Sequence, residues 1–204
     1  MPAASSLIDR AGLDRARVAR IIARGLDGAD DGELFLEYRQ SEMLVFDNGR
    51  LKQATFDTAH GFGLRAVKEE AVGYAHASDL SEAALARAAE AVRAVRGGYS
   101  GQAAEQPART NARLYGDDNP LAAPGFEAKV KLLQDIDAYV RAKDARVRQV
   151  SASLAASWQV VEILRADGAV YRDVRPLVRV NVSVVAGMGD RLEAGSYGYG
   201  GREG

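Results

Sequence analysis

The clearest pattern in the chain is an alternation of apolar and polar residues over residues 174–184. One face carries Val174, Pro176, Val178, Val180, Val182 and Val184, and the other carries Arg175, Leu177, Arg179, Asn181 and Ser183. Alternation with β-branched residues is typical of a half-buried strand. Proline has no N–H to donate, so the pattern places Pro176 at the start or the edge of this strand. After a turn at residues 187–190, residues 191–194 are predicted to return as a partner strand.

Two groups of shorter strands precede this one. Residues 33–46 and 50–56 predict a hairpin, because Asn48-Gly49 between β-forming runs favours a two-residue turn. Residues 61–68 and 72–77 predict two more strands, which would complete a four-stranded meander. Later in the chain, residues 147–156, 158–165 and 169–173 predict strands with a second hairpin at Asp167-Gly168.

Three helices are predicted from apolar periodicity and end signals. The first spans residues 14–24, with Asp14 as its N-cap and with Gly25 and Gly28 ending it. The second spans residues 79–95 and opens with the capping-box spacing of Asp79 and Glu82. The third spans residues 125–143. Its predicted buried stripe consists of Phe126, Val130, Leu133, Ile136 and Val140, widened by Leu132 and Tyr139.

The order of these elements predicts an α+β fold with two halves, each a helical part plus an antiparallel meander. The predicted domains are residues 1–98 and 125–204, joined by a linker over residues 99–124 that contains prolines and no periodicity. Residues 195–204 are glycine-rich and also lack periodicity. We therefore predict a loop there, and expect the chain to continue into a longer protein.

Composition narrows the functional classes. The 204 residues include 27 Lys and Arg against 28 Asp and Glu, so no overall field favours nucleic acid or a membrane surface. The sequence has neither a secretory leader pattern nor an apolar run long enough to cross a bilayer, which predicts a cytoplasmic protein. It contains no cysteine, which excludes disulfides, thiol nucleophiles and thiolate metal ligands within the chain.

Few residues are candidates for chemistry. His60 and His76 lack companion ligands at metal-binding spacings, so we predict no metal site and no catalytic residue in this chain. The glycines match neither a phosphate-binding loop nor a dinucleotide fingerprint. Arg175 and Arg179 share one strand face and are candidate substrate-binding residues, because such a row can hold a carboxylate or an extended peptide. The alternative is a solvated polar face, or arginines paired with acids.

Several stretches resemble one protein family. Residues 173–184, followed by the glycine cluster at residues 195–201, resemble the segment before the catalytic half in the TldD branch of the TldD/PmbA proteins. Residues 61–66, 73–77 and 147–154 are similar to further stretches of that family, in the same order. The resemblance covers the chain from about residue 33 onward.

This resemblance implies the amino-terminal part of a zinc metallopeptidase subunit that pairs with a PmbA/TldE-type sister and cleaves unfolded peptides. The family holds zinc with a His-Glu-x-x-x-His motif and a cysteine, and acts with the motif's glutamate as general base. Neither the motif nor a cysteine is present in this chain. The resemblance thus implies a non-catalytic scaffold that forms part of the substrate chamber, with zinc bound elsewhere in the intact protein.

Two other functions stay open at this point. The first is a non-catalytic peptide-binding or interaction module like the PmbA/TldE sister subunit, whose branch lacks the zinc ligands. The second follows the family's other description, a modulator of DNA gyrase, and makes the chain a nucleic-acid regulator. A net charge near zero disfavours direct contact with nucleic acid.

Overall fold

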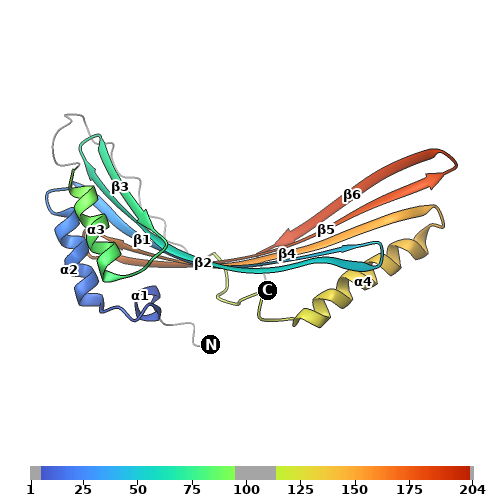
Figure 1. Ribbon diagram of the computed structural model, residues 1–204, viewed down its shortest axis with the longest axis horizontal. Helices are drawn as coiled ribbons and strands as arrows, with labels where there is room; N and C mark the ends of the chain where they lie inside the picture. Colours follow the sequence, from blue (N-terminus) through green and yellow to red (C-terminus); the bar gives the residue numbers. More distant parts are fainter. Residues whose placement is uncertain (1–5, 95–113, 203–204) are drawn as a thin grey trace. The chain divides into compact units, whose positions relative to one another are not determined.

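A computed structural model describes residues 6–94 and 114–202 of the chain (Figure 1). The helices are α1 (Leu7–Arg10), α2 (Arg15–Leu26), α3 (Glu82–Arg93) and α4 (Phe126–Lys143). The strands are β1 (Asp31–Asp47), β2 (Arg50–Lys68), β3 (Ala71–Ala77), β4 (Val147–Arg165), β5 (Val170–Met188) and β6 (Arg191–Gly201). The predicted α+β class is confirmed.

All six strands belong to one antiparallel sheet with the order β3-β2-β1-β4-β5-β6. The sheet consists of two meanders of three consecutive strands, and the meanders meet where β1 lies beside β4. Helices α1, α2 and α3 belong to the half of the sequence that contains the first meander, and α4 immediately precedes the second. The predicted plan of helices plus a meander in each half is therefore present.

The strands are longer than predicted. The segments at residues 50–56 and 61–68 form the single strand β2, and those at 147–156 and 158–165 form the single strand β4. Residues 169–173 and 174–184 likewise belong almost entirely to β5. The first meander consequently has three strands rather than the predicted four, and the five strand segments predicted in the second half also form three strands. Small and polar residues at the expected breaks weaken the strand propensity locally, but hydrogen bonds to the neighbouring strands do not depend on side chains.

The glycine-rich stretch near residue 200 is a strand, so the prediction of a loop there is wrong. β6 pairs with β5 over a register that runs from Val178 opposite Gly201 to Met188 opposite Arg191. Pairing with the backbone of β5 holds β6 in an extended conformation, although its glycine-rich residues 195–201 show no alternation of apolar and polar residues. Pro176 lies inside β5 (Val170–Met188), so its predicted position at the start of the strand is wrong. It precedes Val178, where the pairing with β6 begins, which agrees with the alternative prediction of a strand edge.

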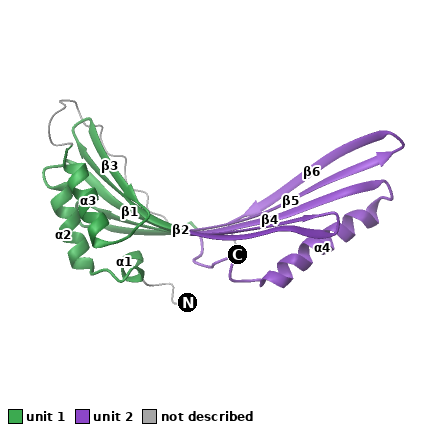
Figure 2. Cartoon of the chain, viewed as in Figure 1, with its two compact units in different colours: residues 1–38, 59–114, 160–173 green, residues 39–58, 115–159, 174–204 purple. Residues whose placement is uncertain are grey.

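Contacts divide the chain into two compact units (Figure 2). Unit 1 comprises residues 1–38, 59–114 and 160–173, and unit 2 comprises residues 39–58, 115–159 and 174–204. Strands β1, β2, β4 and β5 each contribute residues to both units. The units thus alternate along the chain, and the division into consecutive domains at residues 98 and 125 stays a prediction. Most of the predicted linker, residues 95–113, lies outside the described residues.

In unit 1, α2 and α3 pack against each other (Figure 1). The Asp14 carboxylate caps α2 by accepting a hydrogen bond from the Arg17 N–H at 2.7 Å, as predicted. Gly25 does not end the helix. It is buried in the last turn, where a Cβ atom would lie 2.8 Å from the Cβ of Ala89 in α3. Glycine therefore permits the close approach of the two helices.

The start of α3 also differs from the prediction. Its N-cap is Ser81, whose hydroxyl accepts a hydrogen bond from the Ala84 N–H at 3.2 Å. The same hydroxyl donates to the Asp79 carboxylate at 2.8 Å. Asp79 consequently supports the cap rather than forming it.

In unit 2, α4 contributes Leu133 to a core of buried residues from β1 and β4. The other members of this core are Leu44, Phe46, Ala152, Leu154 and Ala156, with Val130, Ile136, Val178, Val180 and Val182 packed against it. The alternation of β5 therefore predicted its buried face. Three predicted members of the α4 stripe are wrong, because Phe126, Leu132 and Tyr139 are exposed.

Candidate functional site

The strands of unit 2 carry a hollow of about 410 Å³, which we call the unit 2 hollow. Its lining includes Arg39 and Ser41 of β1, Asp57 of β2, Ser157 of β4, and Leu177 and Arg179 of β5. Successive residues of a strand point to opposite faces of a sheet. On β1, Arg39 and Ser41 differ by an odd number of positions from the core residues Leu44 and Phe46. The hollow therefore lies on the face opposite the α4 core.

Arg179 has a defined orientation in this hollow. Its Nε–H donates a hydrogen bond to the Asn181 Oδ1 at 2.9 Å. The β6 residues opposite Asn181 and Arg179 are Gly198 and Gly200. A Cβ atom on Gly198 would lie 2.5 Å from the Asn181 Oδ1 and 3.2 Å from the Arg179 Nη2. The absence of a side chain at Gly198 thus gives the Arg179–Asn181 pair the space it occupies.

The charges around the unit 2 hollow are mixed. Arg39 and Arg179 are both exposed, as is Asp57. The Glu42 carboxylate lies on the opposite face of β1, the face of Leu44, where it accepts a hydrogen bond from the Lys129 Nζ of α4. The guanidinium group presents a planar fork of N–H donors that matches the two oxygens of a carboxylate. The arrangement can therefore bind an anionic group at its arginine side.

The structure separates the two arginines that the sequence indicated together. Arg179 lines the unit 2 hollow, whereas Arg175 is exposed on the same strand but does not line it. Arg39 was missed by sequence reasoning. The alternation within residues 33–46 could have placed Arg39 on the face opposite Leu44 and Phe46, but only the fold brings that face beside β5. A substrate-binding role for Arg175 and Arg179 stays a prediction.

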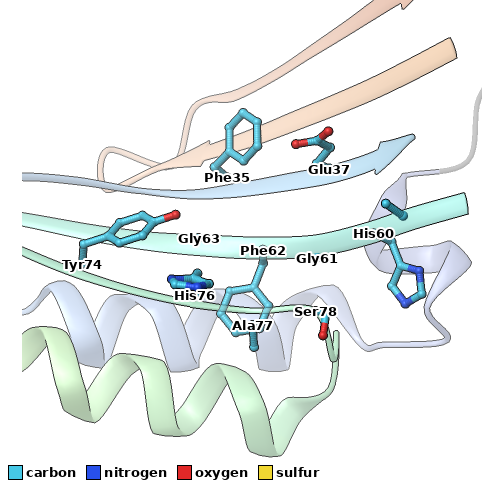
Figure 3. Close-up of a pocket in the computed structure, with 11 residues that line it drawn as sticks. Phe35, Glu37, His60, Gly61, Phe62, Gly63, Tyr74, His76, Ala77 and Ser78 are labelled. Carbon is cyan, nitrogen blue, oxygen red and sulfur yellow. The ribbon is translucent and has the colours of Figure 1, made fainter. Parts of the chain in front are cut away.

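Unit 1 has a second hollow, of about 320 Å³, lined in part by Phe35 and Glu37 of β1 and by Gly61 of β2 (Figure 3). Tyr74 of β3 lies across Gly63, since a Cβ atom on that glycine would be 2.6 Å from the tyrosine Oη. The Tyr74 ring stacks on His76, with ring centroids 5.6 Å apart. Contact with the glycine and the histidine accounts for the position of Tyr74.

Among the described residues, the two histidines do not share one face of the sheet. His76 pairs with Gly63 in the sheet, so it shares the face of that glycine, while His60 is an odd number of positions away on β2 and belongs to the other face. Within residues 6–94 and 114–202, no group of three or more His, Cys, Asp or Glu residues is placed to hold a metal ion. Over the same ranges, no helix combines the length and apolar character of a membrane span.

Comparison with known proteins matches two consecutive parts of the chain to one family. The family described as PmbA/TldA metallopeptidase domain 1 matches residues 32–101, and the PmbA/TldA metallopeptidase central domain matches residues 119–204. The metalloprotease TldD homolog of Haemophilus influenzae is 37% identical over 185 residues. That match covers 89% of this chain and 38% of the relative, so the chain spans well under half of that protein's length.

Solved structures share the fold at low sequence identity. TldE from Thermococcus kodakarensis superposes with a TM-score of 0.75 at 15% identity, over 91% of this chain and 43% of TldE. A Bacteroides thetaiotaomicron protein whose name links it to DNA gyrase gives a TM-score of 0.72 at 12% identity, over 92% of this chain and 45% of that protein. At these identities the likeness concerns the fold alone.

Proposed function

Because the chain belongs to the PmbA/TldD metallopeptidase family, we propose that it is the amino-terminal, non-catalytic part of a TldD-like zinc metallopeptidase subunit. The observation that carries the proposal is the 37% identity to a metalloprotease TldD homolog, over 38% of that protein's length. The sequence has no cysteine and no His-Glu-x-x-x-His motif. The zinc and the general base would therefore come from the part of the intact protein that corresponds to the rest of the relative.

In this proposal the sheet forms a wall of the chamber in which unfolded peptides are bound. The unit 2 hollow supports that role, because it is an open surface that combines arginines with serine hydroxyls and an apolar Leu177. An extended peptide can contact such a face with its side chains and can form hydrogen bonds from its backbone to the polar side chains of the lining. The intact protein would act in the cytoplasm together with a PmbA/TldE-like sister subunit, the partner that the resemblance to the TldD branch of the family implies.

The second candidate is a non-catalytic, PmbA/TldE-like interaction module. The superposition on TldE favours it, but at 15% identity this supports only the shared fold. The higher identity to a TldD homolog favours the peptidase subunit. The sequence that follows residue 204 in the intact protein distinguishes the two, because only the first requires the zinc motif.

The test compares the intact protein, paired with its sister subunit, with these 204 residues alone. Zinc content would be measured by elemental analysis and cleavage with a disordered peptide, with circular dichroism to establish that the shorter chain is folded. We expect zinc and cleavage in the paired intact protein, and neither in the folded 204-residue chain. Stoichiometric zinc or cleavage by the shorter chain would overturn the assignment.

A further inference from the structure

The unit 2 hollow has features of a recognition site that its proposed role as a chamber wall does not require. We infer that it binds a carboxylate of the peptide substrate, with Arg179 as the contacting cation and Asn181 as a positioning residue. This inference rests on the proposed function, since it assumes that the ligand is an extended peptide. The carboxylate would belong to an acidic side chain or to the C-terminus of the peptide.

Arg179 is held in a fixed orientation before any ligand binds. An exposed arginine usually loses side-chain entropy when it binds a ligand, which weakens the contact. Here the Asn181 Oδ1 accepts the Nε–H at 2.9 Å. This bond restrains the side chain before a ligand arrives, and it leaves both Nη groups of the fork for a carboxylate. Arg179 makes no other hydrogen bond within the described parts of the chain.

A glycine lies opposite the Arg179–Asn181 pair. Gly198 is the β6 residue that faces Asn181 in the register, and any side chain there would meet the Asn181 Oδ1 at 2.5 Å. A glycine inside a strand weakens the strand and often marks a place where another group approaches closely. Here the approaching group is the Arg179–Asn181 pair. Arg179, Asn181 and Gly198 consequently form one structural device rather than three unrelated surface residues.

Charge also favours an anion beside Arg179. Arg39 of β1 is a second exposed cation in the lining, while the Glu42 carboxylate lies on the other face of the sheet and is paired with Lys129 of α4. Asp57 is on β2, whereas Arg179 is on β5, and β1 and β4 lie between these strands in the sheet. The arginine side therefore complements an anion, while Asp57 complements a peptide N–H or a basic side chain at the other side. An extended peptide that carries a carboxylate presents both kinds of group.

The experiment measures equilibrium binding of disordered peptides to the intact protein paired with its sister subunit, after chelation of zinc so that the peptides stay uncleaved. One peptide contains glutamates and an amidated C-terminus, a second contains glutamines and a free C-terminal carboxylate, and a third contains glutamines and an amidated C-terminus. We expect the first or the second peptide to bind about threefold to tenfold more tightly than the third, as a charge-assisted contact at a partly exposed site should give. The tighter of the two identifies the source of the carboxylate.

The variants Arg179→Gln, Asn181→Ala and Gly198→Ala test the device. R179Q should abolish the preference for the carboxylate, while N181A and G198A should reduce it. Arg191→Gln is the matched control, because Arg191 is on the neighbouring strand β6 and pairs with Glu193 at 2.8 Å. R191Q should keep the full preference.

The inference is wrong if the three peptides bind equally, or if R179Q retains the preference of the unsubstituted protein. Failure of the proposed function has a different signature. Zinc-dependent cleavage by the paired intact protein, without any carboxylate preference, contradicts only the inference. A preference that R179Q abolishes, in a protein that binds no zinc and cleaves no peptide, contradicts only the peptidase assignment.

Discussion

Lys129 of α4 and Glu42 of β1 form an ion pair in the interior of unit 2, with only 2% and 11% of their side chains exposed. The Lys129 Nζ also donates a hydrogen bond to the Leu121 carbonyl at 3.0 Å. One ammonium group thus joins the helix, a central strand and the segment that precedes the helix. Because both charged groups are removed from water, the ammonium and the carboxylate each need the other as a partner to offset the lost hydration.

Removal of the ammonium alone should be costly. Lys129→Met leaves the Glu42 carboxylate buried without its partner, so we expect the free energy of unfolding to fall by about 3 kcal/mol. Urea denaturation of the intact protein measures the change. Lys131→Met is the control, since the Lys131 side chain is 70% exposed. Its loss should change the free energy of unfolding by about 0.5 kcal/mol or less. Similar effects of the two substitutions would show that the buried pair is unimportant.

A second buried carboxylate fixes the start of the described chain. Glu162 of β4 accepts hydrogen bonds from the Ser6 hydroxyl at 2.9 Å and from the Leu7 N–H at 2.7 Å. Glu162→Ala should lower the free energy of unfolding by about 1–3 kcal/mol, because the Leu7 N–H loses its acceptor. Amide hydrogen exchange of residues 6–10 should accelerate in this variant. Glu127→Ala, at an exposed position of α4, serves as control, and unchanged exchange in E162A would contradict the anchor.

The contact between Gly25 and Ala89 predicts a steric conflict when the glycine is substituted. Gly25→Ala would place the new Cβ atom 2.8 Å from the Ala89 Cβ and 2.9 Å from the Ala89 Cα, so α2 and α3 must separate. We expect the free energy of unfolding to fall by about 1–3 kcal/mol. Ala89→Gly in the same protein should recover only a small part of this loss, because the backbone Cα of residue 89 would still lie at 2.9 Å. Thermal denaturation of the single and double variants measures these changes, and an unchanged stability of G25A would contradict the close contact.

Acid titration tests an exposed pair at the end of α4. The Arg146 side chain and backbone N–H both bond to the Asp144 carboxylate, which lowers its pKa from 3.8 to about 2. A carboxyl with a lowered folded pKa contributes stability above its unfolded pKa, and that contribution is lost as the pH falls through the folded value. NMR titration should therefore give Asp144 a pKa of about 2, and Arg146→Ala should raise this pKa toward 3.8. An unchanged pKa in R146A would assign the shift to another group.

Local sequence patterns predicted where helices and strands occur more accurately than they predicted how long each strand is. The Asp14 cap, the Asn48-Gly49 turn and the alternation of β5 depend on residues near each other in sequence, and all three are present in the structure. The continuity of β2 and β4, and the extension of β6 beyond residue 194, depend on hydrogen bonds to other strands. A sequence window contains no information about those partners, so the breaks and the glycine loop were predicted wrongly.

The candidate site shows the same limit. Arg179 could be selected from the polar face of its own strand, but Arg39 is distant in sequence and joins it only through the order of the sheet. The buried Lys129 was unpredictable for a similar reason. It lies outside the apolar stripe predicted for α4, and its burial is possible only because β1 brings Glu42 to it. Long-range partners decide the roles of both residues.

The alternation of the two compact units along the chain has an evolutionary consequence. Each unit consists of three separate stretches, and four strands pass from one unit into the other. Exchange of one continuous segment of a gene therefore cannot transfer one complete unit, or the complete lining of the unit 2 hollow, without also carrying residues of the other unit.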